Sequence, residues 1–320
     1  MFYAVIIMKI LKRILLSLLI VIGIILLLFI LNYARLNVSY YINKSKYIET
    51  IDVQGNTSRY VPQGLAYSKN YNIAMQTSYN SDRNVSMLYI TDFETGTLLK
   101  SLELIEPDGS NNIHHVGGIT TDENTVWITN DYEVEEYSLE EIITTENDYI
   151  KSIKTSSLPI RGDFCKYNNG TLWIGDFFLN PFYKVPDDNP LLLAYTTEES
   201  YNYSKPSLAI SLPKMVQGMV ITNDNHFVFT ASFTYLIKSN LSIYDNVLNE
   251  EPGTYNLNGA EIPYYKFSEK NLIKNIKLPP MAEGMFNIGN DLYILFESSS
   301  NSYSLALPKL PKVIKFNIEN

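Results

Sequence analysis

The stretch Met281 to Ser298, MAEGMFNIGNDLYILFES, contains the pattern that decides the fold. It reads as a strand led by glycine, an Asn-rich turn and a second strand that ends in polar residues. Four looser copies occur upstream. The five copies share one column, and successive members of that column lie 54, 45, 55 and 66 residues apart: Gly64, Gly118, Asp163, Gly218 and Gly284. Five units of about this length predict the blades of a β-propeller, because one such unit cannot bury its apolar face alone.

The segments between the copies predict four strands per blade and a ring closed by both ends of the chain. The fifth blade has a strand at Val313 to Phe316 and then lacks one more. The alternating segment Tyr47 to Val53 precedes the first copy and can fill that place, which would remove both open sheet edges. The outer strand of the second blade is predicted at Tyr149 to Lys154. Five blades are expected, with six as the alternative if the excursion Asn246 to Pro263 forms strands of its own.

An uninterrupted apolar run extends from Ile14 to Leu31. As a helix it would be about 27 Å long, close to the hydrocarbon thickness of a bilayer. Lys9, Lys12 and Arg13 precede the run, whereas Arg35 alone follows it closely, so the N-terminus is expected in the cytoplasm. The expected organisation is a cytoplasmic basic tail at 1–13, a transmembrane signal anchor at 14–32, a stalk at 33–46 and an extracytoplasmic β-propeller at 47–320.

A cleaved signal peptide is the alternative reading of this apolar run. The run is longer than the apolar part of most signal peptides, and the following sequence LNYARLNVSYY has no convincing cleavage site with small residues. No cysteine lies near its end, which excludes a lipoprotein. A retained anchor at the cell membrane is therefore expected.

Charge and cysteine content narrow the class of protein. The 320-residue chain has 25 basic and 34 acidic residues, and four basic but no acidic residues lie within 1–36. The expected exterior part thus has a net charge of 21 − 34 = −13, which disfavours nucleic acid as a partner. The 46% apolar composition of the whole chain is sufficient for a packed core. The single Cys165 can form no internal disulfide and is expected to be buried.

Candidate binding residues follow from propeller geometry. Loops that enter the innermost strands meet at one end of the axis, so the residues beside the shared column are expected to face a common funnel. The predicted ligand-binding residues are Gln63, His115, Arg161, Asp163, Gln217 and Glu283. Polar residues after the second strands join them at the rim: Thr77, Asn130, Asp131, Asp176, Ser232 and Glu297. This mixed lining suits a polar ligand that is uncharged or zwitterionic. The alternative is that these groups satisfy one another.

Glu283, His115 and Glu297 are candidates for acid–base chemistry, although the sequence assigns none of them a catalytic role. His114 and His115 are adjacent and would point to opposite sides of an extended segment, and His115 is expected to face the axis. Paired with a carboxylate it could transfer protons, and a structural hydrogen-bonded histidine is the alternative. No cofactor is assigned. Asp131, Asp176 and Glu297 could supply oxygen ligands for Ca²⁺.

Motifs of several enzyme classes are absent. The chain contains no HExxH, P-loop, CxxC or GxSxG sequence, so common zinc proteases, nucleotide hydrolases, dithiol enzymes and esterases lose their usual signatures. Five tyrosines fall in predicted loops or insertions, where their rings could stack on a glycan or pack against a protein partner: Tyr201, Tyr203, Tyr255, Tyr264 and Tyr265. The preference of tyrosine for strands is the alternative explanation in a chain with 25 of them.

The segment Val61 to Leu104, VPQGLAYSKNYNIAMQTSYNSDRNVSMLYITDFETGTLLKSLEL, resembles the opening of five-bladed propellers of the glutaminyl-cyclase kind. It shares the QGL triplet, the second strand and the acidic-x-x-Gly turn, a blade pattern also found in lactonase-like and quinoprotein-like propellers. In the cyclase family the second strand carries a Glu before Ser-Thr, whereas this chain has Gln76 before Thr77 and Ser78. An amide cannot act as that acid–base group, so the resemblance implies the fold rather than cyclase activity.

The sequence therefore favours a membrane-anchored extracytoplasmic propeller that binds a small polar ligand, a glycan or a protein partner through its funnel and loops. The alternative is an extracytoplasmic hydrolase or glutaminyl-cyclotransferase-like enzyme that uses the funnel carboxylates and His115.

Overall fold

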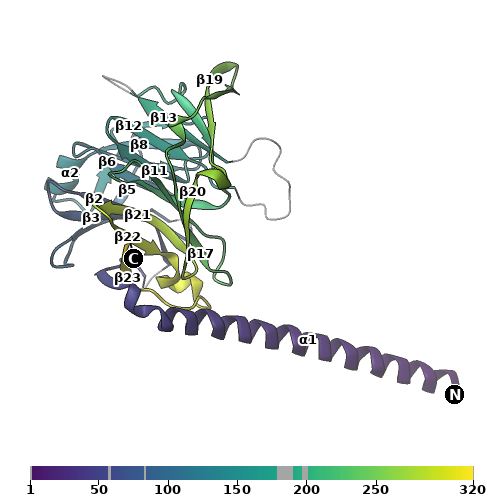
Figure 1. Cartoon of the computed structure of the whole chain (residues 1–320). Helices are drawn as coiled ribbons and strands as arrows, with labels where there is room; N and C mark the ends of the chain where they lie inside the picture. Colours follow the sequence, from purple (N-terminus) through teal and green to yellow (C-terminus); the bar gives the residue numbers. More distant parts are fainter. Residues whose placement is uncertain (1, 57–58, 83, 179–189, 197–200, 320) are drawn as a thin grey trace.

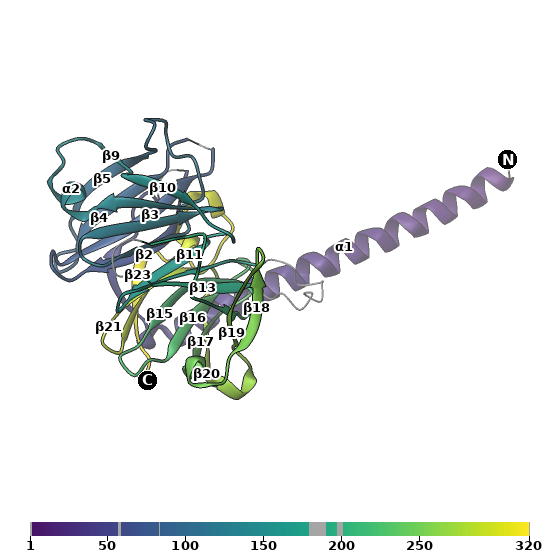
Figure 2. The same cartoon turned by 90° about the horizontal axis from the view of Figure 1, so that it is seen from above.

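Five twisted sheets surround one axis, and a long helix extends away from them (Figures 1 and 2). The structure is a computed structural model that describes all residues except 1, 57–58, 83, 179–189, 197–200 and 320. The sheets are the five blades that the repeat predicts. Each blade has four strands that are antiparallel to their neighbours, and further strands join the outer edges of blades one and three. Most of the Pro-rich insertion between the second and third strands of blade three lies outside the described residues.

From the axis outward, blade one contains β2 (Tyr60–Ser68), β3 (Ile73–Asn80), β4 (Met87–Asp92) and β5 (Leu98–Ile105). Blade two contains β6 (Gly118–Thr121), β7 (Thr125–Asn130), β8 (Glu133–Ser138) and β10 (Lys154–Ser157). Blade three contains β11 (Phe164–Asn168), β12 (Thr171–Gly175), β13 (Leu191–Thr196) and β14 (Leu208–Ser211). Blade four contains β15 (Val216–Ile221), β16 (Phe227–Ala231), β17 (Ser239–Tyr244) and β20 (Leu272–Leu278).

Blade five is completed by the strand that precedes blade one, as the sequence predicts. It contains β21 (Ala282–Ile288), β22 (Asp291–Phe296), β23 (Lys312–Asn317) and β1 (Ile48–Asp52). Ile48 pairs with Lys315 and Glu49 with Ile314 in an antiparallel ladder. The innermost strand of each blade contacts that of the next, and β21 contacts β2, so the ring is closed.

The shared glycines lie where neighbouring inner strands approach one another. A Cβ atom added to Gly218 would lie 2.8 Å from Glu283 O, and one added to Gly284 would lie 2.6 Å from Gln63 O. Threonines of the second strands join blades at the same level, since Thr77 Oγ1 donates to Val116 O at 2.7 Å and Thr230 Oγ1 donates to Glu283 O at 2.8 Å. The repeated Gly and Thr residues thus lie at the contacts between neighbouring blades.

The predicted outer strand of blade two was wrong in its position. Tyr149–Lys151 forms β9, which pairs in parallel with β5 of blade one, through Glu103 opposite Tyr149. The chain then crosses to blade two, where Ile153 N donates to Glu136 O and β10 begins at Lys154. The alternating pattern of this segment fits a strand on either blade, so the sequence could not assign the partner.

The excursion in blade four forms a hairpin but no sixth blade. Strands β18 (Gly253–Leu257) and β19 (Ala260–Lys266) pair with each other, and β19 pairs in parallel with β14. They extend blade three to six strands. Within the described residues, the remaining α-helix besides the N-terminal one is α2 (Leu139–Thr144), which follows β8.

Helix α1 (Phe2–Ile42) is long and apolar enough to cross a membrane. The side chains of its apolar run are about half exposed, with Leu15 at 57% and Leu28 at 60%, so no other described part of the chain covers them. The helix continues through most of the segment 33–46, where Leu36 and Tyr40 are buried and Tyr40 packs against residues of blades four and five. Asn32 Nδ2 donates to Leu236 O at 2.9 Å. The end of the helix is therefore fixed to the propeller.

Candidate functional site

β-Bulges position the predicted funnel residues. The pairing register of the inner strand shifts in three blades, between Pro62 and Leu65, between Val216 and Gly218, and between Ala282 and Met285. A bulge redirects the side chains within it. Gln63, Gln217 and Glu283 all lie in these bulges, each directly before a shared glycine. In these three blades the recurrent glycine therefore marks the bulged position of the inner strand.

Glu283 and Glu297 form a buried carboxyl pair at a cavity. Their side chains are 2% and 8% exposed and hydrogen-bond to each other, and Gln217 Nε2 donates to Glu283 Oε1 at 3.0 Å. Burial, followed by the charge of Glu297, raises the pKa of Glu283 well above its usual value. Protonated Glu283 can donate its hydrogen bond to Glu297.

The cavity beside this pair has a volume of about 180 Å³. Its wall combines acid and amide groups with hydroxyl and aromatic side chains: Gln217, Ser232, Phe233, Thr234, Tyr235, Met281, Glu283, Glu297 and Tyr303. Gln217, Ser232, Glu283 and Glu297 were predicted at the funnel from sequence. The structure brings these four together.

Tyr303 enters the site from a segment that the strand pattern does not reveal. Two short 3₁₀ helices, η4 (Glu297–Ser299) and η5 (Asn301–Tyr303), separate β22 from β23. Ser300 Oγ caps η5 by accepting from Ser302 N, and it donates to Tyr60 O at 2.8 Å. The Tyr303 hydroxyl hydrogen-bonds to Glu297 and to Tyr79, and burial raises the pKa of both tyrosines. No periodic signal in the sequence identifies a tyrosine in such a turn.

His115 contacts the carboxyl pair only indirectly. Its ring packs on Tyr79, with 4.5 Å between the centroids, and Tyr79 leads through Tyr303 to Glu297. Burial lowers the pKa of His115, although the charges of Glu297 and Asp163 oppose this effect. The imidazole is therefore neutral at neutral pH. It lies in the same polar cluster as the acids but does not line the cavity.

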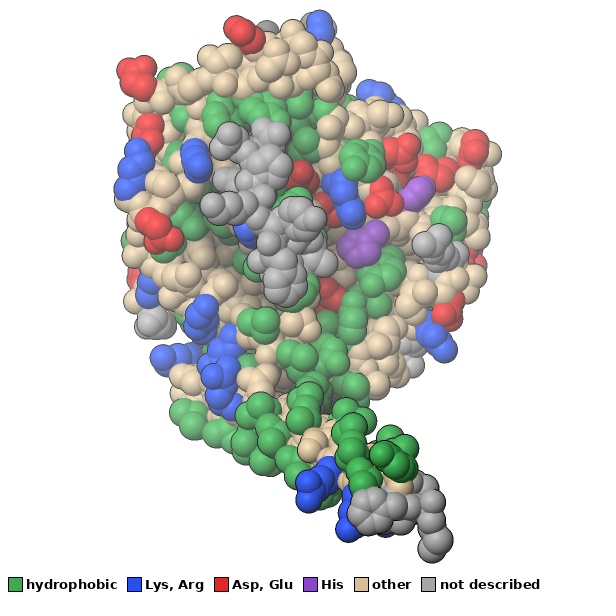
Figure 3. All heavy atoms as spheres, turned by 90° about the vertical axis from the view of Figure 1, so that its right-hand side faces the viewer, with side chains coloured by type: hydrophobic (Ala, Val, Ile, Leu, Met, Phe, Trp, Pro, Cys, Tyr) green, Lys and Arg blue, Asp and Glu red, His purple; other side chains and the backbone are tan. Residues whose placement is uncertain are grey.

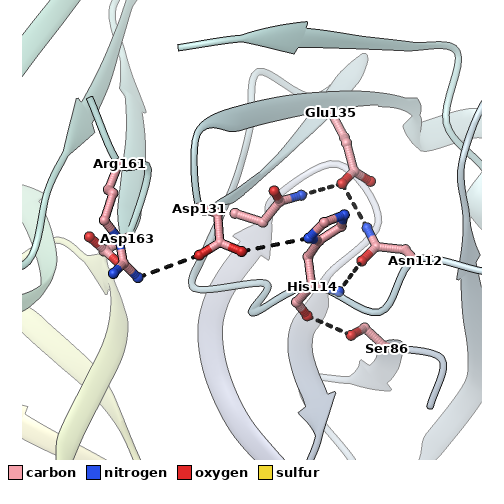
Figure 4. A network of polar contacts seen from close by, with 8 residues as sticks. Ser86, Asn112, His114, Asp131, Glu135, Arg161 and Asp163 are labelled. Carbon is pink, nitrogen blue, oxygen red and sulfur yellow. Dashed lines mark hydrogen bonds and ion pairs between the residues drawn. The ribbon is translucent and has the colours of Figure 1, made fainter. Parts of the chain in front are cut away.

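Arg161 and His114 belong to a neighbouring ion-pair network at the surface, labelled in Figure 4. Arg161 Nη2 lies 2.9 Å from Asp163 Oδ1 and 3.6 Å from Asp131 Oδ1, while His114 Nδ1 lies 3.6 Å from Asp131 Oδ2. Histidine, basic and acidic side chains gather together on this face of the propeller (Figure 3). Because Arg161 is 43% exposed, its pairs contribute little to stability.

Asp163 and Asp176 are acids of blade three, the first buried and the second half-buried. Asp163 Oδ2 accepts from Phe177 N at 2.7 Å, and Asp176 Oδ1 accepts from Leu191 N at 2.7 Å. Burial raises the pKa of Asp163, against the opposing effects of Phe177 N–H and Arg161, and it raises the pKa of Asp176 to about 7. Both side chains accept backbone hydrogen bonds that fix the chain at the end of β12.

The other predicted site residues have structural contacts. Gln63 is 2% exposed and donates to Pro62 O at 3.0 Å, outside the cavity wall. Across the described part of the chain, no group of three His, Cys, Asp or Glu side chains could hold a metal ion, so Asp131, Asp176 and Glu297 do not form a joint site. Tyr203 is 3% exposed, and its hydroxyl donates to Glu136 Oε1 and accepts from Trp127 Nε1. Its ring is therefore not available at the surface for stacking on a ligand.

Glu135 is a further buried acid, which the sequence pattern does not identify. It is fully buried and accepts from Asn112 Nδ2 at 2.7 Å, from Asn130 Nδ2 and from the Tyr137 hydroxyl. Burial raises its pKa to about 8. Asn112 also accepts from His114 N at 2.9 Å, which links Glu135 to the network in Figure 4. Asn130 was predicted at the rim and lies instead in this network.

Gln76 and Cys165 lie inside blades. The Gln76 amide accepts from Gln54 N and donates to Gln54 O, both at 3.0 Å, so it joins the chain that follows β1 to β3. Cys165 is 6% exposed, and burial raises the pKa of its thiol to about 12. The prediction of a buried cysteine is confirmed.

Comparisons with known proteins give similarities of low identity. No model of a protein family and no curated protein matches the sequence. Among solved structures, glutaminyl cyclase from Myxococcus xanthus is 10% identical, with 85% of this chain and 94% of that chain covered and a TM-score of 0.47. The PQQ-bound aldose sugar dehydrogenase from Streptomyces coelicolor is 12% identical, with 84% and 96% covered and a TM-score of 0.47.

A luciferin-regenerating enzyme is 9% identical, with 84% of this chain and 94% of that chain covered and a TM-score of 0.44. The expected five-bladed propeller is confirmed by the sheet topology of the chain itself. At these identities and scores, the likeness carries no argument about activity.

Proposed function

We propose that the protein is a membrane-anchored, outward-facing propeller that binds a small polar ligand in the cavity beside Glu283 and Glu297. The buried carboxyl pair is the observation that supports this most. Moving an ion or a carboxyl group out of water costs free energy unless it forms hydrogen bonds in the protein. A carboxyl pair that faces a cavity keeps oxygen atoms available to accept hydrogen bonds from a ligand. Gln217 and Tyr303 hold the two carboxyl groups in place.

The cavity suits a ligand that is uncharged or zwitterionic and that donates hydrogen bonds. Glu297 and the amide oxygen of Gln217 can accept such bonds, and Phe233 and Tyr235 offer aromatic surface to an apolar part or to an ammonium group. A volume of about 180 Å³ limits the bound part to a small molecule.

The test is a thermal-shift screen of the full chain in detergent with amino acids, hexoses and small primary amines. At least one class is expected to raise the melting temperature of the native chain, and Glu283→Gln and Gln217→Ala are expected to abolish that increase. Glu261→Gln, at an exposed position of the outer hairpin, is the control. A ligand that raises the melting temperature of all four proteins equally would contradict binding in this cavity.

Acid–base catalysis is the second candidate, because two carboxyl groups meet at the cavity and burial favours the protonated form of Glu283. Glu283 would serve as a general acid and Glu297 as a base, in a hydrolase or cyclotransferase. His115 would act through Tyr79 and Tyr303 rather than on the substrate. A screen with glycosides, lactones and glutaminyl peptides tests this: turnover that both Glu283→Gln and Glu297→Gln abolish supports catalysis, and turnover that survives both contradicts it.

A further inference from the structure

A lysine-lined cleft lies where helix α1 joins the propeller. The cleft has a volume of about 390 Å³ and lies between residues 36–47 of the chain and strand β20. Its floor is formed by Leu36, Tyr40, Leu278 and Phe316, all buried. Four lysines line it: Lys46, Lys238, Lys274 and Lys277. No acidic residue belongs to the lining, although residues 37–320 have a net charge of 21 − 34 = −13. The charge of the cleft is thus opposite to that of the body around it.

The bonds of these lysines are to neutral groups. Lys238 Nζ donates to Ser39 Oγ, Lys277 Nζ to Asn240 Oδ1, and Lys274 Nζ to Ile318 O at 3.2 Å. Among the described residues, no ion pair joins any of the four to a carboxylate. Glu49, the acidic residue closest in sequence to Lys46, pairs instead with Lys44, with 3.5 Å between Glu49 Oε1 and Lys44 Nζ. Each ammonium group in the cleft therefore keeps donors and charge for an anion.

The position of the cleft along the helix places it near a membrane surface. The apolar run ends at Leu31, and the hydrogen bond of Asn32 to Leu236 O attaches the propeller one residue later. The loop that contains Leu236 also exposes Phe233 and Ile237, which are 43% and 55% exposed. Leu36 and Ser39 line the cleft and follow Asn32 by a few residues in the same helix, which rises about 1.5 Å per residue. Long lysine side chains can reach from there to the head groups.

We propose that this cleft binds the phosphate head group of an anionic lipid from the membrane that α1 spans. The proposal rests on the membrane anchoring stated under the proposed function. The lysines provide the charge, the hydroxyl of Ser39 and the amides of Asn43 and Asn275 provide further donors, and the buried apolar floor leads onto the apolar helix, along which the acyl chains would lie. Basic side chains gather beside the base of the helix in Figure 3.

The test uses the full chain reconstituted in lipid nanodiscs of phosphatidylglycerol and phosphatidylcholine. Native mass spectrometry counts the lipids that stay bound when the protein is released. Phosphatidylglycerol is expected to be retained several-fold above its share of the bilayer, and high salt is expected to reduce this enrichment. The variant Lys238→Gln, Lys274→Gln, Lys277→Gln is expected to lose it. The matched variant Lys69→Gln, Lys151→Gln, Lys205→Gln, at exposed positions on other blades, is expected to keep it.

Three results would overturn the proposal: retention in proportion to the bilayer composition, equal enrichment in both triple variants, or complete displacement of the lipid by millimolar inorganic phosphate. The last would assign the cleft to soluble phosphate. Circular dichroism of the variants checks that each one is folded. Carbonate extraction of membranes tests the anchoring separately: a chain that carbonate releases contradicts the proposed function, whereas a chain that stays bound without lipid enrichment contradicts this inference alone.

Discussion

Glu135 and Glu283 are carboxyl groups buried in different blades. In both, burial is the largest cause of the raised pKa, which means that the folded protein favours the protonated form. Neither residue stands out from the other acids of the chain by sequence alone. Glu283 could be selected because it precedes a shared glycine, whereas Glu135 lies in an alternating strand, EVEEY, in which three glutamates look equivalent.

The raised pKa of Glu135 predicts a pH-dependent stability. The pKa rises from 4.5 in the unfolded chain to about 8 in the fold, so the contribution of this group is fully present below about pH 4.5 and is lost as pH rises through about 8. Each pKa unit corresponds to about 1.4 kcal/mol. Urea unfolding of the full chain in detergent is expected to show a free energy of unfolding that falls across this range, and Glu135→Gln is expected to flatten the slope.

Glu261→Gln, at an exposed position, is the control and should leave the slope unchanged. An unchanged slope in Glu135→Gln would mean that the carboxyl group is ionised in the folded protein at neutral pH.

At the level of strands, the five-fold repeat was predictable because it arises from contact between blades. The column of glycines marks the closest approach of inner strands, and the strands that follow it alternate as the pleat requires. The outer strands were less predictable. The segments Tyr149–Lys151 and Ala260–Lys266 pair with the neighbouring blade, and an alternating pattern states which face is buried but not which edge is joined.

Gly218→Ala tests the explanation for the glycine column. The new methyl group would lie 2.8 Å from Glu283 O, a backbone atom that cannot move without shifting β21. We expect a loss of about 1–3 kcal/mol in the free energy of unfolding, as for other overpacked positions. Gly253→Ala is the matched control, because its Cβ would meet nothing closer than 3.6 Å. Equal stability of the two variants in urea unfolding would refute a packing role for the column.

At the scale of the whole molecule, the candidate site combines predictable and unpredictable parts. Gln217 and Glu283 could be placed from the repeat, since each occupies a bulge beside the axis. Tyr303 could not, because it lies in a turn of two short 3₁₀ helices. Arg161 was predicted at the funnel, but its charge is engaged by Asp131 and Asp163 at the surface. Contacts that depend on irregular segments leave no period in the sequence.

The proposed function requires that the propeller lies on the outer side of the membrane. Because Cys165 is buried, the native chain is expected to react little with a thiol reagent. A cysteine introduced at an exposed position can therefore report on which side of the membrane it lies. Glu94→Cys places a thiol in the exposed turn between β4 and β5, and Tyr3→Cys places one before the apolar run. In intact cells, a membrane-impermeant maleimide is expected to label Glu94→Cys at once and Tyr3→Cys only after lysis; the reverse order of labelling would contradict an outward-facing propeller.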